Sequence, residues 1–427
     1  MDRADDKDWA GMSRLQIRVI LICIAINMLD GFDILAIAFT APAIAKEWSL
    51  NPEALGGLLS AGLAGMVAGS FLLGPLADRF GRRPIILFGL IIAILGMGGA
   101  ALSQDLTQLA LVRAITGFAV GGMLPCINTM VAEYASPKAR TFSVAMLQAG
   151  FSTGASLGGF SAVWILASAG WQAVFLAGAV LTAILLPLVW FGMPESLAYL
   201  ESRPDRAEEA AKIRSALGEV APTQAATDNG GNVTAIFGQL RGVAAPLALS
   251  SALFFFCIMS FYFINSWTPK ILVDSGLSES AGVSGGALLT LGGIIAALLL
   301  GWMSLRRSVL PLIAAFAIAS AVLTALFGQM GGALAPAMIA AFALCTATSA
   351  TQIGIYAIFP SLFPSAIRAG ATGVGIGVGR LGSVLGPWLA GLLLAKGWGI
   401  EGLFMLMALP YLIGTILIIS LRRYQLH

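Results

Sequence analysis

The chain has 427 residues, of which 58% are hydrophobic and only 11% charged, and its mean hydropathy is +0.90. A protein folded in water needs a more polar surface, so this composition excludes a soluble globular domain and indicates a membrane protein. The net charge of +3 is a signal of membrane topology and not of nucleic-acid binding. The single histidine is the last residue, His427, which excludes a histidine proton relay, a histidine metal site and a Ser-His-Asp triad; neither a metal nor a cofactor is expected.

Apolar windows of about 20 residues, the length of a helix that crosses a bilayer, occur roughly twelve times. The runs are continuous, which excludes the alternating strands of a membrane β-barrel. All four cysteines fall within these runs, where ordinary packing is the expected role. The expected spans are residues 16–40, 54–76, 84–103, 107–133, 141–167, 171–192, 244–267, 281–302, 309–329, 335–359, 370–394 and 401–421.

The distribution of lysine and arginine predicts the orientation of these spans. Only Lys46, Lys270 and Lys396 fall in loops on one side, whereas all other loop arginines and lysines fall on the opposite side. Because positive loop residues concentrate in the cytoplasm, both termini are expected there. The acidic start "MDRADDKDW" lacks the basic n-region of a cleavable signal peptide.

Two acids interrupt the first span, in "INMLDGFDILAIAF" (residues 26–39). Asp30 and Asp33 are three residues apart and so share one helical face, and exposing both to lipid would cost roughly 5–7 kcal/mol. We therefore expect both to face the interior, with Gly31 letting a partner helix or a substrate ring approach. Intramembrane acids are by default sites for ions or protons, and a purely structural role is the alternative.

A basic loop, "GPLADRFGRRP" (residues 74–84), follows the second span and resembles the loop signature of the major facilitator superfamily. Gly74 is expected to allow close helix approach, and Asp78 to meet a neighbouring helix end. The corresponding loop of the second half, "GWMSLRRS" (residues 301–308), lacks the acid. The gating residues that the motif implies are Gly74, Asp78, Arg79, Gly81, Arg82 and Arg83; a merely topogenic basic turn is the alternative.

The fourth span contains "RAITGFAVGGMLP", residues 113–125, which resembles a motif of proton-coupled members of that superfamily. A guanidinium in hydrocarbon costs roughly 2.5–3.5 kcal/mol, so Arg113 needs a polar cavity or a carboxylate; a buried structural ion pair is the alternative. Gly117 and Gly121 should allow tight packing. At the cytoplasmic end of this span, Glu133 is expected to form a gating or interfacial ion pair with Arg140.

A polar segment from about 195 to 240 divides the chain into two halves of six spans each. The expected organisation is an N-terminal bundle (1–192), a cytoplasmic linker (193–243) and a C-terminal bundle (244–427). In the linker, "RPDRAEEAAKIRSALG" predicts a surface helix with Asp205 as its N-cap and Gly218 as its stop. At an offset of 228 the halves match, for example Gly154 with Gly382, as in transporters built from parallel six-span repeats.

Four pieces together are similar to the aromatic acid:proton symporter family, bacterial importers of benzoate-type acids. They are "LDGFD" in the first span, "PESLAYL" after the sixth, "FINSWTPKILVDSGLS" leaving the seventh and "RAGATGVGIGVGRLGSVLGP" in the eleventh. The resemblance covers essentially the whole chain and implies an all-α major facilitator fold of twelve spans in a bacterial cytoplasmic membrane. It also implies roles in transport for Asp30, Asp33, Arg368 and Arg380.

The charges of these side chains suggest a mechanism. If Asp30, Asp33, Arg113 and Arg380 share one cavity, their charges cancel, and a bound aromatic monocarboxylate leaves one negative charge that a proton neutralises. A protonated aspartate would also donate a hydrogen bond to the substrate carboxylate. The expected partners are protons, a small aromatic or muconate-type carboxylate and the lipid bilayer, with a monomer as the expected state; the sequence leaves open which aspartate carries the proton.

Other polar residues at mid-span could line a cavity or equally bond neighbouring helices. They are Gln148, Tyr262, Asn265, Gln352 and Tyr356. Export by proton antiport is the alternative function, because "GFSTGASLGG" (residues 150–159) matches the fifth-span motif of antiporters apart from Ala155, which stands where that motif has proline. A membrane enzyme is not expected, since no nucleophile with a base, metal cluster or nucleotide loop is present.

Overall fold

The structure is a computed structural model that describes residues 7–8, 12–136, 139–217, 243–304, 306, 308–329, 334–363 and 368–424. These residues are almost entirely helical. The only strands among them are β1 (Lys7–Asp8) and β2 (Met12–Ser13), a two-residue antiparallel pair ahead of the first helix. Within these ranges, eleven helices are long and apolar enough to cross a membrane.

The described part of the first half is built from five long helices, three of which begin at a residue whose side chain caps the helix. Ser13 forms a capping box with Gln16, and the side chains of Asn51 and Asp105 cap the second and fourth helices. The helices are α1 (Arg14–Glu47), α2 (Pro52–Phe80), α3 (Arg82–Leu102), α4 (Leu106–Tyr134) and α5 (Arg140–Gly192).

Helix α5 supplies two of the expected spans. Gly170 within it has φ 79° and ψ 177°, a non-helical conformation in the region that favours glycine, and there the 53-residue element turns back on itself. Its two arms, before and after Gly170, correspond to the expected spans 141–167 and 171–192. The eleven spanning helices therefore agree with twelve transmembrane segments.

A short helical segment follows α5 and differs from the expectation. Ser196 caps α6 (Leu197–Glu201), and a 3-10 turn, η1 (Pro204–Arg206), leads directly into α7 (Ala207–Leu217). The prediction of Asp205 as the helix N-cap is wrong, because Asp205 lies inside the 3-10 turn and the chain is already helical there. The expected stop at Gly218 and the linker to residue 242 lie outside the described residues.

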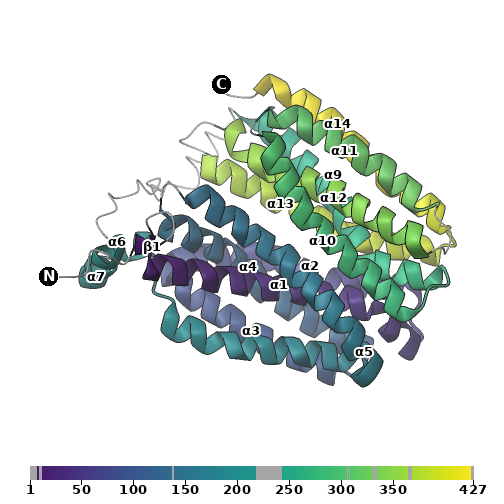
Figure 1. Cartoon of the computed structure of the whole chain (residues 1–427), viewed down its shortest axis with the longest axis horizontal. Helices are drawn as coiled ribbons and strands as arrows, with labels where there is room; N and C mark the ends of the chain where they lie inside the picture. The colour runs from purple at the N-terminus through teal and green to yellow at the C-terminus, as the bar shows by residue number, and fades with distance from the viewer. Residues whose placement is uncertain are drawn as a thin grey trace.

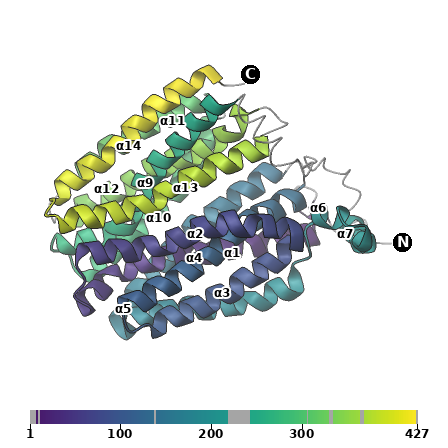
Figure 2. The same cartoon turned by 180° about the vertical axis from the view of Figure 1, so that it is seen from behind.

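The second half lies beside the first, with the purple-to-teal helices on one side and the green-to-yellow ones on the other (Figures 1 and 2). The start of α1 and the end of α14 (Ile400–Leu421) lie at the same end of the helices (Figure 1). The elements are α9 (Ala244–Asp274), α10 (Glu279–Ser304), α11 (Val309–Phe327), α12 (Leu334–Ile358), η2 (Phe359–Leu362), α13 (Arg368–Ala395), α14 (Ile400–Leu421) and η3 (Arg422–Tyr424).

The matched glycines of the two halves occupy equivalent places. A Cβ atom on Gly154 of α5 would lie 1.9 Å from the carbonyl oxygen of Met28 on α1. Its counterpart Gly382 on α13 would place a Cβ 2.2 Å from the carbonyl oxygen of Phe255 on α9. In each half, the fifth span thus packs backbone to backbone against the first, which only glycine permits.

The halves touch each other at the end that the charge distribution places outside. Lys46 at the end of α1 pairs with Glu279 at the start of α10, with 3.1 Å between Nζ and Oε1. A Cβ on Gly56 of α2 would lie 2.9 Å from the Cα of Gly391 on α13. One turn further in, the Ser60 hydroxyl donates to the Val384 carbonyl at 2.9 Å. The structure is therefore closed at this end.

Candidate functional site

A buried ion pair joins α1 to α4. Nη1 of Arg113 lies 2.6 Å from Oδ1 of Asp33, and Nη2 donates to the backbone carbonyl of Asp33 at 2.8 Å. Both side chains are at most 6% exposed. The guanidinium also lies over the ring of Phe175, 5.8 Å from its centroid. Arg113 thus has the carboxylate that its place in the span requires, and Asp33 is the partner.

Asp30, the other acid of the first span, has a different environment. Asp30 is only 2% exposed, and its Oδ2 has no hydrogen-bond partner among the described residues. Gly31 beside it packs on α5, since a Cβ there would lie 2.1 Å from the Phe151 carbonyl oxygen. Of the two expected uses of Gly31, the structure has the approach of a partner helix. A buried carboxylate oxygen without a partner is costly when ionised, so protonation is its direct compensation.

Arg380 joins the second half to the first. It lies on α13, is half-buried, and donates from Nη1 to the Ser70 hydroxyl on α2 at 2.9 Å. Asp30, Asp33, Arg113 and Arg380, three from the first half and one from the second, are the charged side chains of the candidate centre.

A small cavity of about 40 Å³ opens between the halves beside this centre. Its polar walls come from α5, α9, α10 and α12, and two of the five expected lining residues, Tyr262 and Asn265, contribute. The lining residues are Leu35, Phe151, Ser152, Phe261, Tyr262, Asn265, Thr290, Cys345 and Ser349. The volume suits a few water molecules and is far below the roughly 300 Å³ of small-molecule sites, so a small organic ligand requires the helices to move apart.

The three remaining candidates, Gln148, Gln352 and Tyr356, do not line this cavity but lie further along α5 and α12, two of the helices that form its walls. Gln148 is exposed and lies one turn before Ser152 on α5, whereas Gln352 and Tyr356 follow Ser349 on one face of α12. Oε1 of Gln352 is buried without a hydrogen-bond partner in the described part of the chain. The ring of Tyr356 packs edge-on against Phe254, with centroids 5.0 Å apart.

The loop between α2 and α3 has the expected turn but not every expected contact. Asp78 meets Arg82, the first residue of α3, at 2.8 Å, and Gly81 between the helices has φ 103°. Arg79 contributes its carbonyl oxygen, which accepts from the Tyr199 hydroxyl at 3.3 Å. The expectation for Gly74 is wrong: a Cβ there would meet nothing within 4 Å among the described residues, because this part of α2 is not packed against a neighbouring backbone.

Glu195 is the organising residue of this loop, and sequence reasoning assigned it no role. Its Oε1 accepts from the backbone amides of Arg82 at 2.8 Å and Arg83 at 3.1 Å, so a carboxylate caps the N-terminus of α3. It also accepts from the amide of Ser196 at 2.8 Å. The acid in "PESLAYL" was visible in the sequence, but its partner amides lie more than 110 residues away.

Glu133 also bonds this segment. Its Oε2 accepts from the Ser196 hydroxyl at 2.7 Å, and the neighbouring Tyr134 hydroxyl donates to the Glu195 carbonyl at 2.6 Å. The ion pair of Glu133 with Arg140 stays a prediction. The side chain of Arg368 lies outside the described residues, so its expected role stays a prediction as well.

Comparison with known sequences gives one family and a consistent group of relatives. The sequence profile described as Major Facilitator Superfamily matches residues 21–349. The gallate transporter of Pseudomonas putida is 30% identical over 97% of this chain and 94% of its own length. The 4-hydroxybenzoate transporter PcaK of Acinetobacter baylyi is 29% identical over 94% of this chain and 90% of its own.

Solved structures share the fold at low identity. The xylose transporter XylE from E. coli, in a partially occluded inward-open conformation, superposes with a TM-score of 0.76 at 17% identity, over 96% of this chain and 98% of that one. At this identity the likeness concerns the fold alone. The expectation of a twelve-span all-α fold of this type is thereby confirmed.

Proposed function

The chain belongs to the major facilitator superfamily, a superfamily of membrane transporters and not of enzymes, and from this premise we propose that it imports an aromatic carboxylate of the hydroxybenzoate type by proton symport. The names of relatives aligned over nearly the whole chain support the substrate class. Alternating access through two six-helix bundles, in a bacterial cytoplasmic membrane with both termini inside, completes the proposal.

The observation that carries the proton coupling is the unequal pairing of the two acids. Asp33 and Arg113 neutralise each other, which leaves Asp30 and Arg380 as the charges available to ligands. In the proposed cycle Asp30 takes the proton and the substrate carboxylate binds Arg380. Protonation removes the negative charge that would repel the incoming anion and turns Asp30 into a hydrogen-bond donor.

Uptake into proteoliposomes tests this proposal. Labelled 4-hydroxybenzoate should accumulate against its gradient when an inward proton gradient is imposed, with unlabelled gallate and a muconate as competitors that define the substrate class. Asp30→Asn should abolish accumulation yet retain exchange of labelled for unlabelled substrate, because the neutral amide imitates the protonated acid. Asp105→Asn, which removes an exposed carboxylate at a helix cap, is the matched control and should transport normally.

Two outcomes contradict the proposal. If no aromatic or muconate-type acid accumulates under an imposed gradient, the substrate class fails, and proton-driven export becomes the function to test. If Asp30→Asn loses exchange as completely as accumulation, Asp30 does not act as the proton site.

A further inference from the structure

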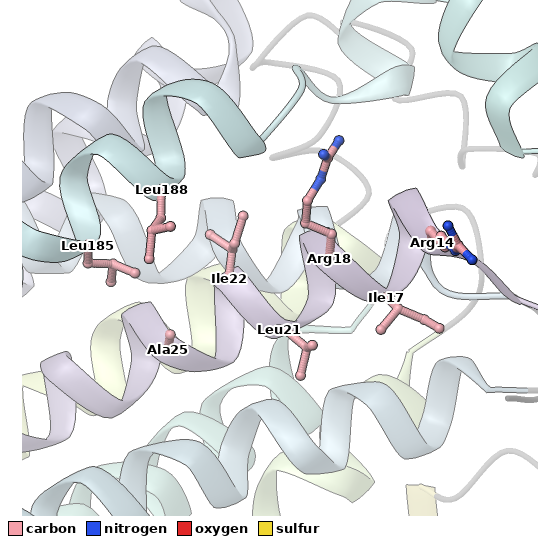
Figure 3. A pocket seen from close by; sticks show the side chains of 8 residues that line it. All are labelled: Arg14, Ile17, Arg18, Leu21, Ile22, Ala25, Leu185 and Leu188. Atoms are coloured by element: carbon pink, nitrogen blue, oxygen red, sulfur yellow. The ribbon is translucent and has the colours of Figure 1, made fainter. Parts of the chain in front are cut away.

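A groove with a basic rim lies at the start of α1, on the outer surface of the first half and away from the transport centre. It has a volume of about 430 Å³ and runs between α1 and the second arm of α5. Figure 3 shows two arginines at one end and apolar side chains along the rest. The lining residues are Arg14, Ile17, Arg18, Leu21, Ile22, Ala25, Leu185 and Leu188.

The apolar part of this groove continues deeper along the same helices. A second groove of about 900 Å³ shares Ala25, Leu185 and Leu188 with the first and extends between α1 and the two arms of α5. Its lining is almost wholly aliphatic or glycine, with Phe32 as its aromatic member and Ser161 its polar one. The two grooves together form one long groove on the membrane-facing surface, charged at one end and apolar along its length.

The charged end lies where the membrane meets the cytoplasm in the proposed orientation. Arg14 and Arg18 are one helical turn apart, both are exposed, and they open the span. A Cβ on Gly192, the last residue of α5, would lie 3.9 Å from Cδ of Arg18. Just before it, Trp190 and Phe191 are 52% and 83% exposed, the aromatic pattern of a membrane interface.

We propose that this long groove binds an anionic phospholipid of the cytoplasmic leaflet, whose phosphate contacts Arg14 and Arg18 and whose acyl chain lies along Ala25 and Leu188. The arginines match the charge of the phosphate, and the aliphatic groove matches the chain at the depth where a lipid presents both groups. A soluble anion would occupy the basic rim alone and would leave the apolar part of the long groove unfilled.

Native mass spectrometry of the purified full-length transporter tests the site, with phosphatidylglycerol as the probe and phosphatidylcholine as the neutral reference. The double variant Arg14→Gln/Arg18→Gln should weaken phosphatidylglycerol binding by about tenfold or more, since each arginine near an anionic lipid contributes severalfold to affinity. The double variant Arg422→Gln/Arg423→Gln removes the same charge from the other chain end, where both residues are exposed, and should change binding less than about twofold.

A second variant tests the chain-binding part without touching charge. Ala25→Leu places a larger side chain where the two grooves join and should also weaken phosphatidylglycerol binding while both arginines remain. Equal losses in the Arg14/Arg18 and Arg422/Arg423 variants would overturn the proposal, because binding would then follow net charge. Displacement of the lipid by inorganic phosphate would overturn it too, because the rim alone would then be the site. Neither result depends on which substrate is transported.

Discussion

The buried ion pair between Asp33 and Arg113 predicts a stability effect that a double-mutant cycle can measure. Removing one partner leaves the other as an uncompensated charge in a site at most 6% exposed, which costs about 3–5 kcal/mol. Replacing both by apolar residues removes the pair and the orphaned charge together, which is often neutral. Asp33→Leu and Arg113→Met should therefore each destabilise the protein strongly, and the double variant should recover most of the loss.

Thermal unfolding in detergent with a thiol-reactive dye provides the assay, because Cys23, Cys126, Cys257 and Cys345 are free and buried and react only when the fold opens. At roughly 1–2 °C per kcal/mol for a chain of this length, each single variant should lower the unfolding midpoint by about 3–10 °C.

The surface pair of Lys270 and Asp274 provides the matched control. Breaking it with Lys270→Gln should cost less than about 1 kcal/mol. The reasoning is refuted if the losses of Asp33→Leu and Arg113→Met simply add in the double variant, since additive losses mean that the two side chains do not interact.

Three further predictions concern closure, the cytoplasmic loop and the driving force. Gly56→Val adds a side chain whose Cβ would lie 2.9 Å from the Cα of Gly391, and it should reduce uptake at least about tenfold. Gly57→Val is the control and should retain uptake, because a Cβ there would meet nothing within 4 Å among the described residues. Equal uptake by the two variants would contradict closure at this contact. Glu195→Gln removes the negative charge that caps the N-terminus of α3. In the thiol-dye assay it should lower the unfolding midpoint by the equivalent of about 1–2 kcal/mol of stability. An unchanged midpoint would exclude that capping role. Accumulation of 4-hydroxybenzoate should follow an imposed pH gradient and not a valinomycin-imposed potential, because one proton with one monocarboxylate carries no net charge; accumulation driven by the potential alone would require another stoichiometry.

The spans and the interior position of both aspartates follow from the sequence because insertion in lipid leaves few alternatives. A run of 20 apolar residues must form a helix, and a carboxylate within it must face protein. The packing roles of Gly117 and Gly121 were predictable for the same reason: a Cβ on either would lie about 2 Å from a carbonyl oxygen of α2, at Gly62 and Met66.

What the sequence did not reveal depends on contacts between distant segments. The role of Glu195 requires knowing that residues 195 and 82 meet, and no local pattern encodes a distance of 113 residues. Gly74 shows the converse, since its motif suggested tight packing but the neighbouring backbone lies elsewhere in this conformation. Asp205 failed as a cap because the preceding turn already starts the helix.

The ion pair of Arg113 with Asp33 also determines which charges of the centre are left without a partner of opposite sign. Sequence spacing treats Asp30 and Asp33 alike, because a separation of three places both on one face. The contact at 2.6 Å makes them unlike: Asp33 is held by a cation from its own half, whereas Oδ2 of Asp30 has no hydrogen-bond partner among the described residues. Of the four charged side chains of the centre, the two outside the ion pair thus come from different halves, Asp30 from α1 and Arg380 from α13. A proton on one and a carboxylate on the other would neutralise both, so the loaded centre would favour rearrangement of the halves and a half-loaded one would resist it.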